Sequence, residues 1–294
     1  MRIAILIVTY TSPIQTQRLI ERLDNGQFDF YIHLDKKQDM DTHKNLFDVP
    51  RVYFIKDRVD VRWGGYSTAK AAINGVKQIG SSGIKYDYIS LISGQDYPIK
   101  PAWYIIETLQ NNIGKQFIEY RSFDTEWQEA FARVDRFHFN DLKIPGKYRF
   151  QNLFNFFVKR GKMPVDLKLY GVTTFWTLSP ECALYVGNFL EKNKKFNRFL
   201  KYTWGTDEFI FQTVLMNSQY KDELTNTNHT LAEFPQGQAR PKFFTTEDFD
   251  KLIASEKFFA RKFSIDIDEN ILDMIDDYCL KMKNIKKQPD GLYN

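Results

Sequence analysis

Apolar runs and amphipathic segments alternate along the first hundred residues of the chain. Four runs rich in aliphatic, β-branched and aromatic residues have the length of buried strands: 2–10, 28–34, 51–56 and 86–92. Two segments between them repeat apolar residues at helical spacing: 13–23 and 67–79. This alternation predicts an α/β fold with a mostly parallel central sheet, as in a Rossmann-like nucleotide-binding half.

The fourth run is nearly continuous in apolar residues, which is typical of a strand buried on both faces of a parallel sheet. It stops at the small and polar tetrapeptide Ser93-Gly94-Gln95-Asp96, and Pro98 ends the turn. Open α/β sheets bind ligands at the carboxyl ends of their strands, so the tetrapeptide predicts a ligand site. The alternative is an ordinary strand-to-helix loop, because Gly, Asp and Pro are common in loops.

The rest of the chain predicts two further strands, at 116–120 and 170–178. Helices are predicted at 103–113, 180–190, 207–216, 247–254 and 270–282. We expect Thr11 or Ser12 to cap the first helix and Thr206 to cap the 207–216 helix. Without a repeat or linker, one domain is predicted over 1–285, with a nucleotide half over about 1–100, an acceptor half over about 101–285, and a polar tail at 286–294.

Composition narrows the classes of function. Apolar residues make up 43 % of the 294 residues, enough for a sizeable core, and the 16 % of aromatic residues suit core packing or stacking surfaces for a sugar or nucleotide. The net charge of +4 does not by itself indicate nucleic-acid binding. No GxGxxG or Walker motif is present, which argues against dinucleotide and phosphate-loop sites.

Two cysteines, Cys182 and Cys279, form no zinc or disulfide pattern. The N-terminal residues are too short for a membrane span and lack a cleavage site, so they are interpreted as a first strand. We therefore expect a cytoplasmic protein, with a possible peripheral contact at the inner face of the membrane.

A basic and aromatic region extends from Glu126 to Met163. Its cationic or titratable members include Arg133, Arg136, His138, Lys143, Lys147, Arg149, Lys159, Arg160 and Lys162. Phenylalanines alternate with them at 150, 154, 156 and 157. We predict that the part from Lys143 to Lys162 contacts a membrane surface or forms a lid over an acceptor site. The alternative is an amphipathic helix packed on the sheet.

Two consecutive acids, Asp207-Glu208, are the sharpest candidates for chemistry. Following Thr206, both are placed in the first turn of a predicted helix, where the backbone dipole favours negative charge. An ionised carboxylate there can accept a proton from a hydroxyl. The alternative is that both acids only stabilise the helix terminus.

Three Asp-x-Asp strings are present, at 39–41, 248–250 and 266–268, and none follows an apolar strand as a metal-binding pair does in metal-dependent sugar-nucleotide transferases. We therefore expect no metal cofactor. Without a metal, a leaving diphosphate needs fixed cations. Candidates flank one short predicted helix: Arg240, Lys242, Arg261 and Lys262. The alternative for these cations is a solvated basic surface.

Seven stretches together resemble the core-2/I-branching family of β-1,6-N-acetylglucosaminyltransferases, which includes the peptide O-xylosyltransferases, in a bacterial-type form. The stretches are IHLDKK at 32–37, STAKAAINGV at 67–76, SGQDYPIK at 93–100, Glu119, GVTTFWTLSPECALYV at 171–186, TDEFIFQTV at 206–214 and FFARKF at 258–263. The resemblance covers most of the chain and implies a GT-A-like fold, a UDP-sugar donor, a glycan acceptor, inversion at the anomeric carbon and no metal.

The resemblance also implies roles for individual residues. Glu208 would be the catalytic base. The donor would contact Asp35, Trp63, Gly94, Gln95, Asp96 and Lys262, with Arg240 or Lys242 beside Lys262 at the diphosphate. The acceptor would face Glu119, Arg136 and Asp207. The sequence departs from the family at Tyr10-Thr11, where a histidine is common, and only Phe234 represents an aromatic pair before the basic residues.

The function expected from the resemblance is transfer of a sugar, N-acetylglucosamine first among the candidates, to a glycan in cell-surface polysaccharide synthesis. Transfer of xylose or a hexose by the same fold is an alternative. A carbohydrate- or nucleotide-binding module without turnover is another alternative, against which the presence of both Glu208 and Lys262 argues. Nucleic-acid binding is not expected, because the basic region contains no recognisable module.

Overall fold

The computed structural model describes residues 1–10 and 12–287. Its strands are β1 (Ile3–Thr9), β2 (Phe28–Leu34), β3 (Val52–Phe54), β4 (Tyr88–Ser93), β5 (Asp96–Pro98), β6 (Gln116–Ser122), β7 (Tyr170–Leu178), β8 (Leu224–Thr225), β9 (Thr230–Ala232) and β10 (Phe259–Arg261). Its α-helices are α1 (Pro13–Leu23), α2 (Tyr66–Gly80), α3 (Ala102–Gln110), α4 (Lys147–Phe157), α5 (Pro180–Lys192), α6 (Lys194–Leu200), α7 (Ile210–Met216), α8 (Phe249–Ala254) and α9 (Asn270–Lys287). Short 3₁₀ helices are η1 (Met40–Leu46), η2 (Gln128–Arg133), η3 (Thr206–Glu208), η4 (Lys221–Glu223) and η5 (Thr246–Asp248).

The main sheet has the strand order β3-β2-β1-β4-β7-β6-β8. Strands β1 to β4 are parallel, and β7 is antiparallel to its neighbours β4 and β6. The register of β1 places Leu6 opposite Tyr31 of β2 and Leu91 of β4, so the carboxyl ends of these three strands meet at one edge. A second sheet, β5-β10-β9, continues from the end of β4.

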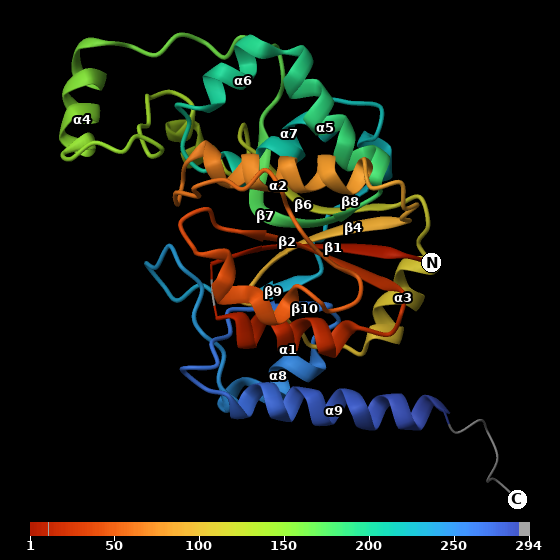
Figure 1. The fold of residues 1–294 in the computed structure, drawn as a ribbon. Helices are drawn as coiled ribbons and strands as arrows, with labels where there is room; N and C mark the ends of the chain where they lie inside the picture. Colours follow the sequence, from red (N-terminus) through yellow and green to blue (C-terminus); the bar gives the residue numbers. More distant parts are fainter. Residues whose placement is uncertain (11, 288–294) are drawn as a thin grey trace, which may run out of the picture.

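Helices cover both faces of the main sheet (Figure 1). Helices α2, α5, α6 and α7 lie on one face, and α1, α3, α8 and α9 lie on the other with the small sheet. Each face buries its own apolar cluster. The cluster beneath α1 joins residues 3–109 to residues 244–279, so the two predicted halves share a core.

Close packing of α2 on the sheet depends on a glycine. A Cβ at Gly75 would lie 2.4 Å from a methyl group of Leu6, so only glycine lets the helix approach β1 this closely. Ala69 and Ala72 on the same helix are also small and buried. The alanine-rich composition of this helix therefore sets the distance between the helix and the sheet.

The predicted strands and helices of the first hundred residues are present, and β4 is buried on both faces as expected. Asp96 begins a short strand of its own, β5, which was not predicted.

The predicted helix at 207–216 is wrong at its start. The 3₁₀ helix η3 comes first, Phe209 separates it from α7, and Thr206 makes no capping hydrogen bond. Ser12 occupies the N-cap position of α1 without a side-chain hydrogen bond, and Thr11 lies outside the described residues.

Helix α4 does not pack on the sheet, so the alternative interpretation of the basic aromatic region is wrong. The helix stands at the edge of the molecule, held out on two connecting segments (Figure 1). None of its residues is buried.

At the C-terminal end of the chain, α9 extends to Lys287, and residues 288–294 of the predicted polar tail lie outside the described residues. Within the part of the chain that is described, no helix is long and apolar enough to span a membrane.

Candidate active site

Asp35 lies directly after β2, at the edge where β1 and β4 also end. Its backbone N–H donates to the carbonyl oxygen of Thr9 at 2.9 Å. Its buried carboxylate accepts a hydrogen bond from the Lys37 backbone N–H and pairs with the Lys37 ammonium, each at 2.9 Å. Asp35 is therefore held where open α/β sheets bind ligands.

Asp96 is fully buried at the start of β5 and forms an ion pair with Arg261 of β10 at 3.0 Å. The Ser93 backbone N–H also donates to its carboxylate. Burial raises the pKa of Asp96, while the positive charge of Arg261 acts in the opposite direction. The ion pair joins the end of the central strand to the segment that carries the predicted cations.

Gly94 and Gln95 are held by their backbone carbonyl groups. The Gln15 side-chain amide donates to the carbonyl oxygens of Gly94 at 2.8 Å and Phe263 at 3.1 Å, and the Phe263 backbone N–H donates to the Gln95 carbonyl at 2.9 Å. These bonds leave the Gln95 side chain half-buried. Gly94 and Gln95 thus form a hydrogen-bonded turn between β4 and β5, so the segment leads to a strand and not directly to a helix, and its contact with a ligand stays a prediction.

Lys262 and Arg240 gather beside the Asp96–Arg261 pair. Burial lowers the pKa of the Lys262 ammonium, and the positive charges of Arg261 and Arg240 lower it further. Three cations from two segments therefore act on one another here, which is the arrangement that a diphosphate would stabilise.

Lys242 is directed elsewhere. Its ammonium lies 3.0 Å from the carboxylate of Glu233 and 2.6 Å from that of Asp248. Because two carboxylates already neutralise it, Lys242 fits a structural role in joining the 233–242 segment to η5. Of the two alternatives left open by the sequence, the geometry therefore favours Arg240 over Lys242 as the partner of Lys262.

Stacked side chains connect these cations to the predicted catalytic acid. The Arg240 guanidinium lies 5.8 Å from the ring centre of Trp63, which is 61 % exposed. The Trp63 ring meets the Trp204 ring edge-on at 5.6 Å. The Arg133 guanidinium lies between the rings of Trp204, at 4.2 Å, and Trp127, at 4.3 Å. This series of contacts brings four segments that are distant in sequence to one surface.

Two glycines allow the loop before Glu208 to approach the turn at Trp63. The Gly205 N–H donates to the Gly64 carbonyl at 2.8 Å, and both residues have left-handed backbone conformations, with φ of 62° and 70°. A Cβ at Gly64 would lie 2.4 Å from the Trp204 indole nitrogen, and one at Gly205 would lie 2.5 Å from the Arg133 guanidinium. Glycine is therefore required at both positions.

Glu208 ends η3, and its carboxylate accepts a hydrogen bond from Arg133 Nη1 at 2.6 Å. The Glu208 side chain is 33 % exposed and that of Arg133 is 13 % exposed, so solvent reaches the Glu208 carboxylate. The helix-dipole argument for the Glu208 charge is not supported, because α7 begins only at Ile210. A fixed guanidinium holds this carboxylate instead.

Asp207 points to a different environment from Glu208. Its carboxylate accepts a hydrogen bond from Thr174 Oγ1 at 2.7 Å. Burial, followed by the negative charge of Glu208, raises the pKa of Asp207 to about 7. Thr174 belongs to an irregular stretch of β7 opposite Glu119, where the β6–β7 register shifts. Such bulges often redirect side chains beside active sites.

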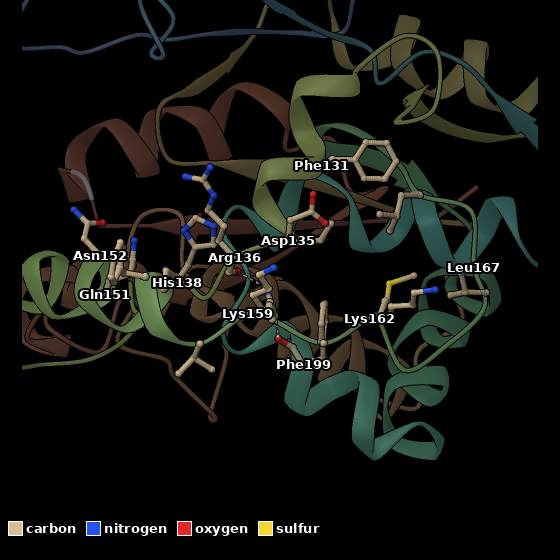
Figure 2. Close-up of a pocket in the computed structure, with 18 of the residues that line it drawn as sticks. Phe131, Asp135, Arg136, His138, Gln151, Asn152, Lys159, Lys162, Leu167 and Phe199 are labelled. Carbon is tan, nitrogen blue, oxygen red and sulfur yellow. Dashed lines mark hydrogen bonds between the residues drawn. The ribbon is translucent and has the colours of Figure 1, made fainter.

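Arg136 lies apart from Glu208, on a cavity of about 1080 Å³ between α4 and the body of the molecule. Figure 2 shows Arg136, His138 and Lys159 among the residues that line it, with Asp135 and the amides Gln151 and Asn152. Arg136 is exposed and is not brought together with the Glu208 carboxylate. Arg133, three residues earlier, takes that position instead.

A family model described as Core-2/I-Branching enzyme matches residues 3–258. The chain belongs to the Core-2/I-Branching enzyme family. Among relatives, xylosyltransferase oxt of Drosophila melanogaster is 22 % identical over 295 residues, covering 90 % of this chain and 32 % of that protein. Xylosyltransferase 2 of Homo sapiens is 24 % identical over 304 residues, covering 94 % and 33 %. The chain spans about a third of the length of these curated relatives.

Solved structures show weaker likeness. The WbbM bifunctional glycosyltransferase in its apo form gives a TM-score of 0.41 at 12 % identity, covering 98 % of this chain and 51 % of that chain. The apo form of mouse xyloside xylosyltransferase 1 gives 0.40 at 9 % identity, covering 88 % and 96 %. The family match and the observed sheet order confirm the predicted α/β, GT-A-like fold of this family member.

The sequence reasoning missed three residues of the candidate site: Arg133, Trp127 and Trp204. Arg133 stands in the basic region that was singled out, but nothing local distinguishes it from the cations around it. The signal that could have found it is the cluster of tryptophan and arginine residues, because these side chains stack when they share a surface. The pairing itself depends on two loops that meet only in the folded chain.

The three Asp-x-Asp strings have structural roles in this family member. Asp39 caps η1 by accepting from the Asp41 N–H, Asp248 completes a capping box with Thr245, and Asp268 accepts from the Thr246 N–H. Among the described residues, no group of three or more histidine, cysteine and acidic side chains is arranged to hold a metal. Metal independence remains a prediction.

Proposed function

We propose that this chain is an inverting glycosyltransferase that moves a sugar from a UDP-sugar to a hydroxyl group of a glycan. One observation carries the proposal: the Arg133–Glu208 pair and the cations Arg240 and Lys262 are linked across one surface by the rings of Trp63 and Trp204. An acid and a cationic cluster on one surface suit attack on one side of a sugar and departure of a diphosphate on the other.

In the proposed reaction, Glu208 removes the proton from the acceptor hydroxyl as its oxygen attacks the anomeric carbon. The bond from that carbon to the diphosphate oxygen breaks, and both of its electrons leave with UDP. Lys262 and Arg240 stabilise the negative charge that develops on the diphosphate. Arg133 acts in this proposal as a positioning residue, because it holds the Glu208 carboxylate. General-base help of this kind contributes about 10²–10⁴-fold to the rate.

The position of Asp35 suits the nucleoside part of the donor, at the strand edge next to the tetrapeptide 93–96. The bulge at Glu119, together with Asp207, suits the acceptor side. Arg136 lines the cavity in Figure 2, and an acceptor that reaches it extends from Glu208 along the segment 133–136.

Two donors have specific support. The resemblance of the seven sequence stretches to β-1,6-N-acetylglucosaminyltransferases favours UDP-N-acetylglucosamine. The names of the relatives favour UDP-xylose, because both are called xylosyltransferases. We propose UDP-N-acetylglucosamine as the donor, in cell-surface polysaccharide synthesis, and UDP-xylose as the second candidate.

The test is a panel of UDP-sugars with the purified chain in EDTA. Thermal shift identifies the donor, because a ligand at 100 times its dissociation constant stabilises the folded state by ~2.7 kcal/mol. UDP release with transfer to oligosaccharide acceptors then measures turnover. We expect one donor to bind and to be consumed in EDTA. Donor binding without UDP release or transfer indicates a binding module, and activity lost in EDTA but restored by Mn²⁺ contradicts the metal-independent mechanism.

A further inference from the structure

The segment from Lys143 to Lys162, here called the α4 arm, is held away from the sheet (Figure 1). One face of α4 binds the backbone of residues 137–139. The Phe137 N–H donates to Asn155 Oδ1 at 2.9 Å, Asn155 Nδ2 donates back to the Phe137 carbonyl at 2.8 Å, and the Phe139 N–H donates to Gln151 Oε1 at 2.8 Å. The orientation of α4 is therefore fixed, and one helix face is already occupied.

The opposite face of α4 is apolar and uncovered. Phe156 is 81 % exposed, Phe157 is 74 % exposed and Leu153 is 59 % exposed. At 100° per residue these three side chains project from the side opposite Gln151 and Asn155. A surface helix normally has polar residues on the side that faces water, whereas α4 has aromatic and aliphatic residues there. Such a surface requires an apolar partner.

The charge of the α4 arm identifies the partner. The arm contains six cations and no acid: Lys143, Lys147, Arg149, Lys159, Arg160 and Lys162. Lys143, Lys147 and Arg160 are engaged, with Asp60, the Asn140 carbonyl and the Phe199 carbonyl respectively. Arg149, Lys159 and Lys162 are exposed on the same arm. The apolar face is thus surrounded by positive charge, which repels a second copy and attracts an anionic surface.

We propose that the α4 arm docks on an anionic membrane surface. Phe156, Phe157 and Leu153 enter the boundary between headgroups and acyl chains, as the apolar face of an interfacial helix does. Arg149, Lys159 and Lys162 contact the anionic headgroups. Because Phe156, Lys159 and Lys162 also line the cavity in Figure 2, the docked membrane borders that cavity.

Vesicle co-sedimentation tests the proposal without reference to catalysis. The probes are vesicles of phosphatidylcholine alone and vesicles of phosphatidylcholine with phosphatidylglycerol, at low and high salt. We expect binding to the anionic vesicles that weakens as salt increases. The double variant Phe156→Ser/Phe157→Ser should bind about tenfold or more weakly. The triple variant Arg149→Gln/Lys159→Gln/Lys162→Gln should lose roughly fivefold for each cation removed.

Matched controls lie on the far side of the molecule. Ile113 follows α3, and Ile113→Ser removes an apolar side chain that is 62 % exposed. Lys281→Gln/Lys283→Gln removes two exposed cations from α9. These controls should bind vesicles as the parent chain does. Melting temperatures establish that the arm variants fold, as expected for exposed positions.

Several outcomes would overturn the proposal. The first is equal binding to neutral and anionic vesicles, and the second is equal loss of binding in the control variants. The third is a concentration-dependent dimer in sedimentation velocity that Phe156→Ser/Phe157→Ser abolishes in the absence of vesicle binding. The fourth is binding of a single-stranded oligonucleotide by the arm with none to vesicles. Donor binding and UDP release are measured separately, so their failure does not bear on this result.

Discussion

Arg133 Nη1 lies 2.6 Å from Oε2 of Glu208, although 75 residues separate the two in the chain. The guanidinium is stacked between the rings of Trp127 and Trp204, so it cannot move away from the carboxylate without losing both aromatic contacts. Only Gly205 leaves room for it at this point of the loop. The Glu208 carboxylate is therefore positioned by an Arg133 side chain that is itself held by packing. Such preorganisation favours catalysis.

Replacement of Glu208 by Gln keeps the shape of the side chain and removes its basicity. We expect turnover to fall by roughly 10²-fold or more while binding of the UDP-sugar stays nearly unchanged. Steady-state kinetics and calorimetry measure the two quantities. A Gln variant that transfers sugar at close to the parent rate would leave Glu208 with a structural role only.

Arg133→Met fills the space between the two indole rings and removes the charge that holds Glu208. We expect kcat to fall at least about tenfold, because the base loses its orientation, with little change in KM for the donor. Arg133→Ala should in addition lower the free energy of unfolding by about 1–2 kcal/mol, since both cation–π contacts are lost. If Met and Ala variants lose stability equally and Met retains full kcat, Arg133 acts only in packing.

The pKa of Asp207 predicts a pH dependence of stability. The folded chain keeps the Asp207 proton up to about pH 7, while the carboxyl in the unfolded chain releases it near its ordinary value of 3.8. Between the two pKa values the folded chain binds more protons than the unfolded chain, so the free energy of unfolding decreases as pH rises. Above about pH 7 the contribution of the Asp207 proton to this free energy is lost. Asp207→Asn should therefore raise Tm at pH 8 and have little effect near pH 4. An Asn variant that is less stable at pH 8 would contradict the raised pKa.

Arg240 and Lys242 are expected to differ in their contribution to donor binding. Arg240→Ala should weaken UDP binding by about tenfold or more, because a charge-assisted contact to the diphosphate is lost. Lys242→Ala should leave UDP binding nearly unchanged and lower Tm, since Lys242 holds Glu233 and Asp248. Calorimetry with UDP separates the two. Lys262→Ala serves as the reference for loss of a diphosphate contact. If Lys242→Ala weakens UDP binding more than Arg240→Ala does, Lys242 and not Arg240 is the partner of Lys262.

Asp35 is predicted to contact the nucleoside of the donor. Asp35→Ala should weaken UDP binding by about tenfold, as expected when a hydrogen bond from the nucleoside to a charged acceptor is lost. Asp35→Asn is the matched control for structure, because its amide oxygen can still accept from the Lys37 N–H. Unchanged UDP affinity in the Ala variant would remove Asp35 from the donor site.

Local patterns were sufficient for the strands that build the site. Strands β1, β2 and β4 are runs rich in apolar residues, and each is followed by residues that end a strand. Both their burial and the edge at which they meet could therefore be predicted. The positions of Asp35 and Asp96 after or near those ends follow from the same information. The strands and the residues at their ends depend on interactions between residues close in sequence. The spacing of apolar residues along the chain reflects these interactions.

The tertiary structure alone decided which charged side chains meet. The resemblance assigned Arg136 to the acceptor, whereas the fold directs Arg133 to Glu208 and Arg136 to the cavity beside α4. The fold likewise assigns Lys242 to two carboxylates and leaves Arg240 over Trp63. The start of α7 and the outward position of α4 were also decided at this level. The physical reason is that an ion pair or a stacked ring depends on the approach of two loops in space, and no local spacing in the chain encodes that distance.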